Sequence, residues 1–231
     1  MKVIGLIGGM SWESTVEYYR LMNESVKEKL GGLHSVKCVL YSVDFAEVEG
    51  LQRRGQWAKA AQLLVDAAQN VERAGADLAL ICTNTMHKLA DTVQAAIGIP
   101  LLHIADATAE KVKQAGIQRV GLLGTRFTME EDFYRGRLTD QFGLEVVIPD
   151  PEDRETVHRI IYEELCVGTI RPESKARVAG IMSRLVEMGA QGIILGCTEL
   201  GLLLDAQDSR VPLFDTTRVH AMAAVELAFK S

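Results

Sequence analysis

The chain alternates short, continuous apolar runs with longer stretches in which apolar residues recur every three or four positions. The short runs are typical of strands that are buried on both faces, and the longer stretches are typical of amphipathic helices. In the first half we expect strands at residues 3–7, 36–44 and 77–82, a further apolar segment at 99–103, and helices at 12–30, 56–75 and about 86–97. Strands that alternate with helices predict parallel sheets covered by helices.

The second half of the chain repeats this pattern. Residues 119–124 correspond to 3–8, residues 172–190 to 56–75, and residues 211–215 to 99–103. Matching positions lie 116 residues apart near the start of each repeat, 114 in the middle and 112 at the end. We interpret this as a duplicated β/α unit with small insertions. The prediction is an α/β protein of two pseudo-symmetric domains with mainly parallel sheets, comprising residues 1–98 plus 212–231 and residues 99–211.

A small polar cluster follows the same strand in each repeat, and the two clusters place Thr83 opposite Cys197. Open parallel sheets bind ligands beyond the carboxyl ends of their strands, so we expect residues 83–85 and 197–199 to approach one ligand from opposite sides, in an inter-domain cleft. An acid and a base on opposite faces of one carbon can invert a stereocentre. Asn84, Thr85 and Thr198 suit a carboxylate ligand, although Asn84 and Thr85 can also be helix caps.

Composition narrows the class of protein. The 231 residues carry a net charge of −6, with 48% hydrophobic and 24% charged residues, which argues against nucleic acid or an anionic membrane as a partner. No apolar stretch approaches the ~20 residues of a membrane span, and we expect no signal peptide and a cytoplasmic location. The four cysteines form no CxxC pair and the histidines are scattered, so we expect neither disulfides nor a metal site. The Gly8-Gly9 turn lacks the full dinucleotide-binding pattern.

Several motifs together resemble the cofactor-independent aspartate/glutamate racemases, and within them the members specific for L-aspartate and L-glutamate. The resemblance covers the whole chain and rests on 5-GLIGGMSWEST-15, Asn84-Thr85 with His87, 121-GLLGT-125, 196-GCTE-199 and 215-DTTRVHA-221. It implies two pseudo-symmetric α/β domains, a homodimer, a small amino-acid substrate, no cofactor, and abstraction and return of the proton at the α-carbon.

One departure from the family concerns the catalytic pair. The family usually carries Cys-Asn-Thr in its first half, where this chain has Thr83-Asn84-Thr85. Cys82 is adjacent, but neighbouring strand residues point to opposite faces, so we expect Cys82 in the core. A threonine hydroxyl is a far weaker acid than a thiol. We therefore expect Cys197 to exchange protons on one face, and Thr83, or a water that it orients, to serve the other face poorly, so that the L enantiomer is preferred.

Other candidate residues each have two interpretations. Members of the family contact substrate through the backbone at the position of Met10, which could otherwise be a core residue. Gln52, or Arg53 beside it, could donate to a side-chain carboxylate. Glu164 could pair with the substrate ammonium or be a solvated helix residue. Glu199 could bind the substrate amine, tune the thiol, or cap the next helix.

Two other functions fit the same residues. Decarboxylases of substituted malonates resemble this architecture and use a single second-half cysteine to protonate a carbanion. A catalytically weak amino-acid-binding protein would bind the ligand and be stabilised by it without exchanging the α-proton.

Overall fold

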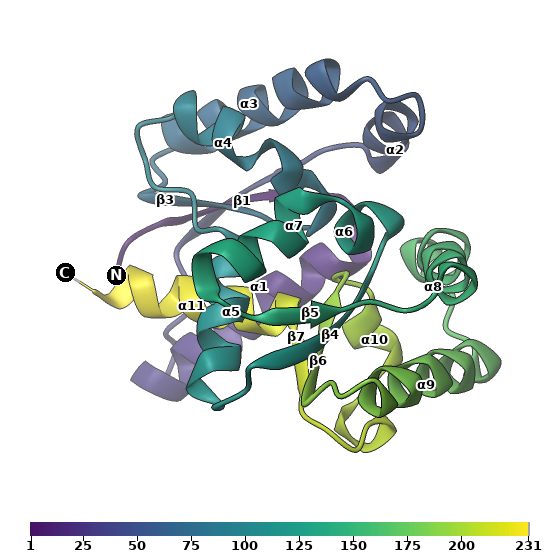
Figure 1. Ribbon diagram of the computed structural model, residues 1–231. Helices are drawn as coiled ribbons and strands as arrows, with labels where there is room; N and C mark the ends of the chain where they lie inside the picture. The colour runs from purple at the N-terminus through teal and green to yellow at the C-terminus, as the bar shows by residue number, and fades with distance from the viewer. Residues whose placement is uncertain (231) are drawn as a thin grey trace. The chain divides into compact units, whose positions relative to one another are not determined.

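A computed structural model describes residues 1–230 (Figure 1). The chain separates into two compact units, one containing Met1–His103 and the segment that begins at His220, the other containing Ile104–Val219. Each unit is built on a parallel sheet, which confirms the predicted α/β class. Whether the two halves are independent domains, as the repeat suggests, stays a prediction. None of the helices within residues 1–230 is long and apolar enough to cross a membrane.

The first unit contains a three-stranded sheet in the order β2-β1-β3. Its strands are β1 (Ile4–Gly8), β2 (Cys38–Ser42) and β3 (Leu78–Ile81). The apolar segment at 99–103 adds only an isolated bridge between Leu101 and Ala79. The β1 strand is buried at every position, as expected of a central parallel strand.

Helices cover both faces of this sheet. On one face, α3 (Trp57–Arg73) packs with α2 (Phe45–Arg53) and α4 (Ala90–Ala95) against apolar side chains that include Ile7 and Ile81 (Figure 1). On the other face, α1 (Trp12–Leu30) and the later part of α11 (Thr216–Phe229) pack against Leu6, Leu80 and Cys82. Cys82 is 0% exposed within this core, so its predicted packing role is confirmed.

The second unit contains a four-stranded sheet in the order β5-β4-β6-β7. One face packs against α8 (Pro151–Glu163) and α9 (Pro172–Glu187), and the other against α5 (Ile104–Gln114), α7 (Asp132–Gly136) and the segment that follows it. The strands and long helices are β4 (Arg119–Gly124), β5 (Glu145–Val147), β6 (Gly192–Gly196), β7 (Leu213–Asp215), α5 (Ile104–Gln114), α8 (Pro151–Glu163) and α9 (Pro172–Glu187). The short helices are η1 (Thr85–Leu89), α6 (Arg126–Glu130), α7 (Asp132–Gly136), η2 (Arg137–Gln141), η3 (Leu165–Val167), α10 (Leu200–Leu203) and η4 (Ala206–Asp208).

The repeat is visible in the two sheets. The bridge at Leu101 occupies the place of Leu213 on β7, and the helix that precedes the polar cluster ends in each half at a glycine with positive φ, 94° at Gly75 and 93° at Gly189. At Gly5 on β1, a Cβ would lie only 2.9 Å from the Cβ of Ala76. The glycine therefore allows the chain that follows α3 to approach the strand closely.

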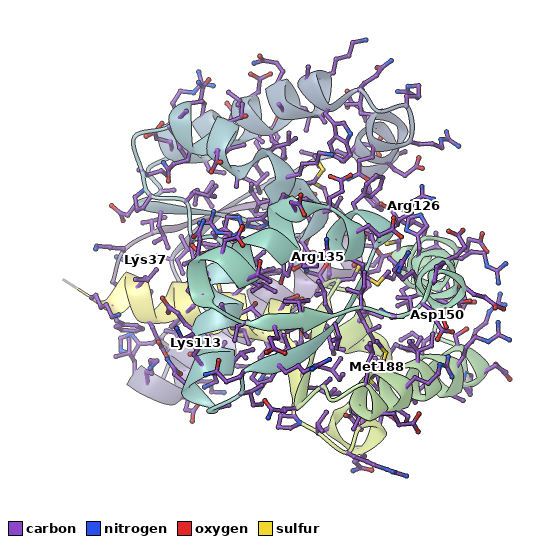
Figure 2. All side chains as sticks on the ribbon, in the orientation of Figure 1. Lys37, Lys113, Arg126, Arg135, Asp150 and Met188 are labelled. Carbon is purple, nitrogen blue, oxygen red and sulfur yellow. The ribbon has the colours of Figure 1, made fainter. Side chains whose placement is uncertain are left out.

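Helix ends account for two differences from the sequence prediction. Asp150 caps α8 by accepting the Asp153 N–H at 2.9 Å, and Met188 follows the last residue of α9 (Figure 2). However, α8 ends at Glu163 with Glu164 as its C-cap, and the chain then turns into η3. The helix predicted at about 86–97 is split into η1 and α4.

Candidate active site

The second polar cluster begins directly after β6. Cys197 has the same side-chain orientation as Ile193 and Leu195 and lies in the core cluster that α8 and α9 cover. Only 6% of Cys197 is exposed, and Thr198 and Glu199 are each 2% exposed. A thiol, a hydroxyl and a carboxylate are thus buried together at the carboxyl end of a parallel strand, where such sheets bind ligands.

Glu199 accepts two hydrogen bonds within this cluster. Its Oε2 receives the Cys197 Sγ–H at 2.9 Å and the Thr198 Oγ1–H at 3.0 Å. Burial raises the pKa of the Cys197 thiol well above its ordinary value, and the negative charge of Glu199 raises it further. Cys197 is therefore a thiol at rest, and the carboxylate that can receive its proton is already hydrogen-bonded to it.

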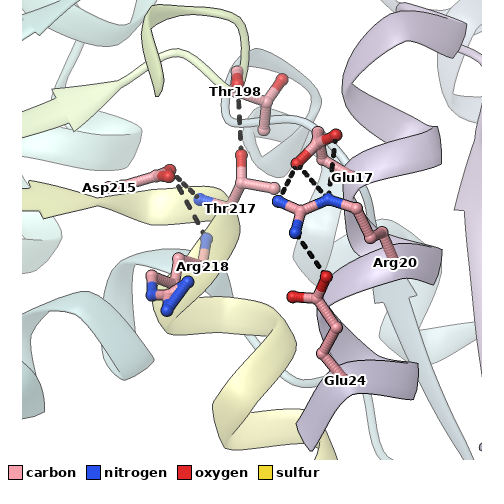
Figure 3. A network of polar contacts seen from close by, with 7 residues as sticks. All are labelled: Glu17, Arg20, Glu24, Thr198, Asp215, Thr217 and Arg218. Atoms are coloured by element: carbon pink, nitrogen blue, oxygen red, sulfur yellow. Dashed lines mark hydrogen bonds and ion pairs between the residues drawn. The ribbon is translucent and has the colours of Figure 1, made fainter. Parts of the chain in front are cut away.

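The start of α11 is hydrogen-bonded to the main chain of this cluster. The Thr216 hydroxyl donates to the Leu195 carbonyl at 2.8 Å, and the Thr217 hydroxyl donates to the Thr198 carbonyl at 3.3 Å. Asp215 accepts the Thr217 N–H at 2.9 Å and so fixes the first turn of the helix (Figure 3). The 215-DTTR-218 motif is thereby explained, because its hydroxyls bind the main chain on both sides of Cys197.

The first polar cluster follows β3 in the same way. The Cys82 N–H still donates to Ile7 in the sheet at 2.9 Å, and the Thr83 N–H then turns back to the Ile81 carbonyl at 2.9 Å. Thr83 is partly exposed, whereas Asn84 and Thr85 are buried. Within its own unit Thr83 occupies the position that Cys197 occupies in the other. Each residue comes shortly after the strand that pairs with the first strand of its unit, β3 beside β1 and β6 beside β4.

Met10 and Gln52 lie in the first unit. Met10 is 2% exposed and packs in the apolar cluster with Ile7, so its side chain is a core residue and only its backbone remains a candidate for substrate contact. Gln52, near the end of α2, is buried and donates its Nε2–H to the Met86 sulfur at 2.9 Å.

Glu164 lies in the second unit. It is half-buried and accepts the Ser174 hydroxyl at 2.7 Å. Glu164 is the C-cap of α8: its N–H donates to the Ile160 carbonyl at 3.1 Å, while its side chain points towards the start of α9. Its role towards a substrate ammonium stays a prediction.

Comparison with known proteins decides the family. The family model for Asp/Glu/Hydantoin racemase matches residues 7–224, which include both polar clusters. The chain belongs to this racemase family. It is therefore an isomerase of the amino-acid racemase type.

Three relatives show how far this racemase resembles known members. A crystal structure from Yersinia pestis, whose assignment as an Asp/Glu racemase is itself provisional, is 59% identical over 100% of both chains with a TM-score of 0.92. An aspartate racemase homologue from Pyrococcus horikoshii OT3 is 38% identical over 100% of both chains with a TM-score of 0.85. The broad specificity amino-acid racemase RacX from Bacillus subtilis (strain 168) is 27% identical over 173 residues, 73% of each chain.

One group of residues in this racemase was missed as a group by sequence reasoning. His87, His103 and His220 come from distant parts of the sequence, yet their rings meet in the first unit, with centroids 4.5 Å apart for His87 and His103 and 5.8 Å apart for His87 and His220. No spacing rule could have found them, since the three segments are joined only by the fold. Among residues 1–230, no group of three or more His, Cys, Asp or Glu side chains is arranged to hold a metal ion.

Proposed function

We propose that this protein is a cofactor-independent racemase of aspartate or glutamate that removes and returns the proton at the α-carbon. The observation that carries the proposal is the buried pair of the Cys197 thiol and the Glu199 carboxylate, at the strand end that matches Thr83 in the repeat. The family and the aspartate racemase homologue among its relatives support this substrate class. In the proposed complex, Cys197 and Thr83 face opposite sides of one α-carbon.

The proton of the thiol has a defined acceptor in this proposal. Cys197 must be a thiolate to remove the α-proton, but burial favours the neutral thiol. Transfer of the thiol proton to Glu199 Oε2, 2.9 Å away, forms the thiolate without releasing a proton to solvent. The thiolate then takes the α-proton of the L substrate and becomes a thiol again.

The second face is served by Thr83 or by a water that it orients. A hydroxyl is a poor resting base, so return of a proton to the D side is slow compared with exchange at the Cys197 side. The equilibrium constant between two enantiomers in water is one, so kcat/KM must be equal in the two directions. The two enantiomers should therefore differ in the rate of α-hydrogen exchange with solvent and not in kcat/KM. The L substrate exchanges its α-hydrogen through Cys197 many times for each inversion, whereas the D substrate exchanges slowly.

The remaining polar residues are assigned to holding the substrate. We assign Asn84, Thr85 and Thr198 to the α-carboxylate, because they are buried donors beside the two acid/base positions. Gln52 is assigned to the side-chain carboxylate, together with the backbone at Met10. Glu164 supplies negative charge for the ammonium group, and Glu199 supplies it as the substrate binds, before it takes the thiol proton.

Incubation of the protein with single L-amino acids in heavy water tests this function. L-aspartate or L-glutamate should gain one mass unit while it stays in the L form, and the D form should accumulate more slowly. Cys197→Ser should abolish the exchange, while Cys166→Ser, on η3, should retain it. Release of carbon dioxide from substituted malonates without amino-acid exchange would favour a decarboxylase. Ligand-induced stabilisation without any exchange would favour a binding protein.

We also propose a homodimer in a reducing cytoplasm. Trp12, Val16 and Tyr19 share one face of α1 and are 65%, 50% and 54% exposed, which makes an apolar patch suited to a second copy. Light scattering should give a molar mass of two chains for the wild-type protein and of one chain for Val16→Glu. Exposed Val167→Glu is the matched control. All four cysteines are free, as a reducing compartment requires.

A further inference from the structure

Three buried histidine rings lie beside the first polar cluster, and the proposed mechanism does not use them. His87, on η1, is 3% exposed, His103 is 7% exposed, and His220, on α11, is 0% exposed. Their rings meet edge to face, and the Tyr18 ring on α1 contacts His220 with its centroid 5.7 Å away. Charging three buried imidazoles in contact is unfavourable, so the hydrogen-bond partners of each ring matter to which nitrogen carries its hydrogen.

The tautomer of His220 follows from its two partners. Its Nε2 lies 2.9 Å from the Leu102 carbonyl, which only accepts, so Nε2 carries the hydrogen. Its Nδ1 therefore accepts from the Tyr18 hydroxyl at 2.8 Å. Burial, assisted by the nearby His87, lowers the pKa of His220 to about 3, so this neutral form persists at physiological pH. His220 is thus a neutral ring, held by two hydrogen bonds, that packs against His87.

His87 contacts both His220 and the first polar cluster. Its Nδ1 lies 2.7 Å from the Thr83 carbonyl, and because a carbonyl only accepts, Nδ1 carries the hydrogen and donates. The Thr83 N–H is already bound to the Ile81 carbonyl. Both peptide groups that flank the Thr83 side chain are therefore held, one by the strand end and the other by His87.

The second unit holds the matching position differently. The Cys197 carbonyl accepts the main-chain N–H of Leu200 at 3.1 Å, so the backbone itself closes that turn. At Thr83 the corresponding carbonyl takes its hydrogen bond from a side chain four residues further along. The Thr83 carbonyl is consequently held by one imidazole, whereas the Cys197 carbonyl is held by the main chain.

We propose that His87 is a positioning residue for the Thr83 side of the reaction, acting through the Thr83 carbonyl and braced by His103 and His220. This rests on the proposed racemase function, in which Thr83 or its water serves the D face. Loss of the Nδ1–H donor frees the peptide that follows Thr83, so the hydroxyl loses its fixed direction. Inversion should suffer, while exchange of the L substrate through Cys197, in the other unit, should continue.

Two amide variants separate this role from a structural one. His87→Asn places its Nδ2–H near the position of the imidazole Nδ1, whereas His87→Gln places its amide near the position of Nε2 and cannot easily reach the carbonyl. Both are measured in heavy water with L-glutamate and L-aspartate, and the readout is the ratio of deuterium exchange into L to formation of D. Exposed His34→Gln is the control and should keep the wild-type ratio.

We expect His87→Gln to lower inversion by about tenfold or more and exchange by less than about threefold, since misplacing a catalytic group by about 1 Å can cost up to about a hundredfold. His87→Asn should recover most of the inversion. An unchanged ratio in His87→Gln, or an equal loss of exchange and inversion in both variants, would overturn the proposal. If the wild-type protein exchanges neither amino acid, the racemase proposal itself fails instead.

The wild-type protein gives an independent test that needs no folded variant. Nitrogen-15 NMR of the histidine rings should find His87 protonated at Nδ1 and His220 protonated at Nε2 at neutral pH. A His87 ring protonated at Nε2 alone could not donate to Thr83, and would overturn the proposal.

Discussion

Replacement of Glu199 by glutamine separates the two effects that the carboxylate has on Cys197. Burial, the larger cause, keeps the pKa of the thiol high in either protein, but the variant loses the negative charge that raises it further. For charges 2.9 Å apart, Coulomb's law gives about 6 kcal/mol at an effective dielectric of about 20 and about 1.4 kcal/mol in water. The pKa of Cys197 should therefore fall in Glu199→Gln, while burial still keeps it above its ordinary value.

In Glu199→Gln the Cys197 thiol should become more acidic, but the exchange of the substrate α-hydrogen should become slower. Without the carboxylate, the thiol proton has no internal acceptor, so exchange into L-glutamate at pH 7.5 should fall by about a hundredfold, within the range of a lost general base. It should recover as the pH rises and the thiol ionises to solvent. Glu187→Gln, an exposed change on α9, is the matched control.

The assay for acidity is the pH dependence of Cys197 alkylation by iodoacetamide, followed by mass spectrometry of the peptide that contains it. A pKa that stays the same or rises in Glu199→Gln would refute the electrostatic account. An unchanged or faster exchange at pH 7.5 would refute Glu199 as the proton acceptor, even if the pKa falls as expected.

Three further predictions concern single sites. Thr83→Cys should raise deuterium exchange into the D enantiomer by about tenfold or more, since a thiol is much the stronger acid; no gain in exchange would count against Thr83 as the second acid/base position. His220→Gln should lose less stability than the wild-type protein on acidification. In the wild-type protein His220 binds a proton below about pH 6.5 when the chain is unfolded, but only near pH 3 when it is folded. Between these values the free energy of unfolding of the wild-type protein should therefore fall by about 1.4 kcal/mol more per pH unit than that of the variant. Urea unfolding at pH 6.5, 5.5 and 4.5 measures this, and parallel slopes would contradict it. Gly5→Ala should destabilise by about 1–3 kcal/mol, because its Cβ would meet Ala76 and Val71. Gly180→Ala, in α9, should stabilise by up to about 1 kcal/mol, because its Cβ would make only an ordinary contact with Arg184 Nη1 at 3.9 Å. Chemical denaturation that fails to rank the two variants in this order would contradict the packing argument.

Much of the fold was predictable because its signals are local or periodic. The offset of 114 residues between Thr83 and Cys197 reproduces the equivalence of β3 and β6, and alternation along β3 correctly assigned Cys82 to the core. Failures occurred where the chain leaves regular structure. The break after α8, which turns Glu164 towards Ser174, has no strong sequence signal, since Gly168 comes only after the 3₁₀ turn.

The polar contacts within the two clusters were harder to predict than the positions of the clusters at strand ends. That Glu199 would accept from Cys197 was one of three interpretations, because a residue two positions along can point in several directions after a strand ends. The His87, His103 and His220 cluster depends on three segments that only tertiary packing brings together. Sequence reasoning therefore located both polar clusters but could not assign hydrogen-bond partners within them.

The measurement that tests the central account most directly is the exchange of the α-hydrogen in heavy water, started separately from pure L-glutamate and pure D-glutamate and read by chiral chromatography with mass detection. The account predicts rapid deuterium uptake into L-glutamate with retention, slow inversion, and little uptake into D-glutamate that has not inverted. Equally rapid exchange of both enantiomers would contradict it, because a thiol and a hydroxyl could not then be the two unequal partners at the α-carbon.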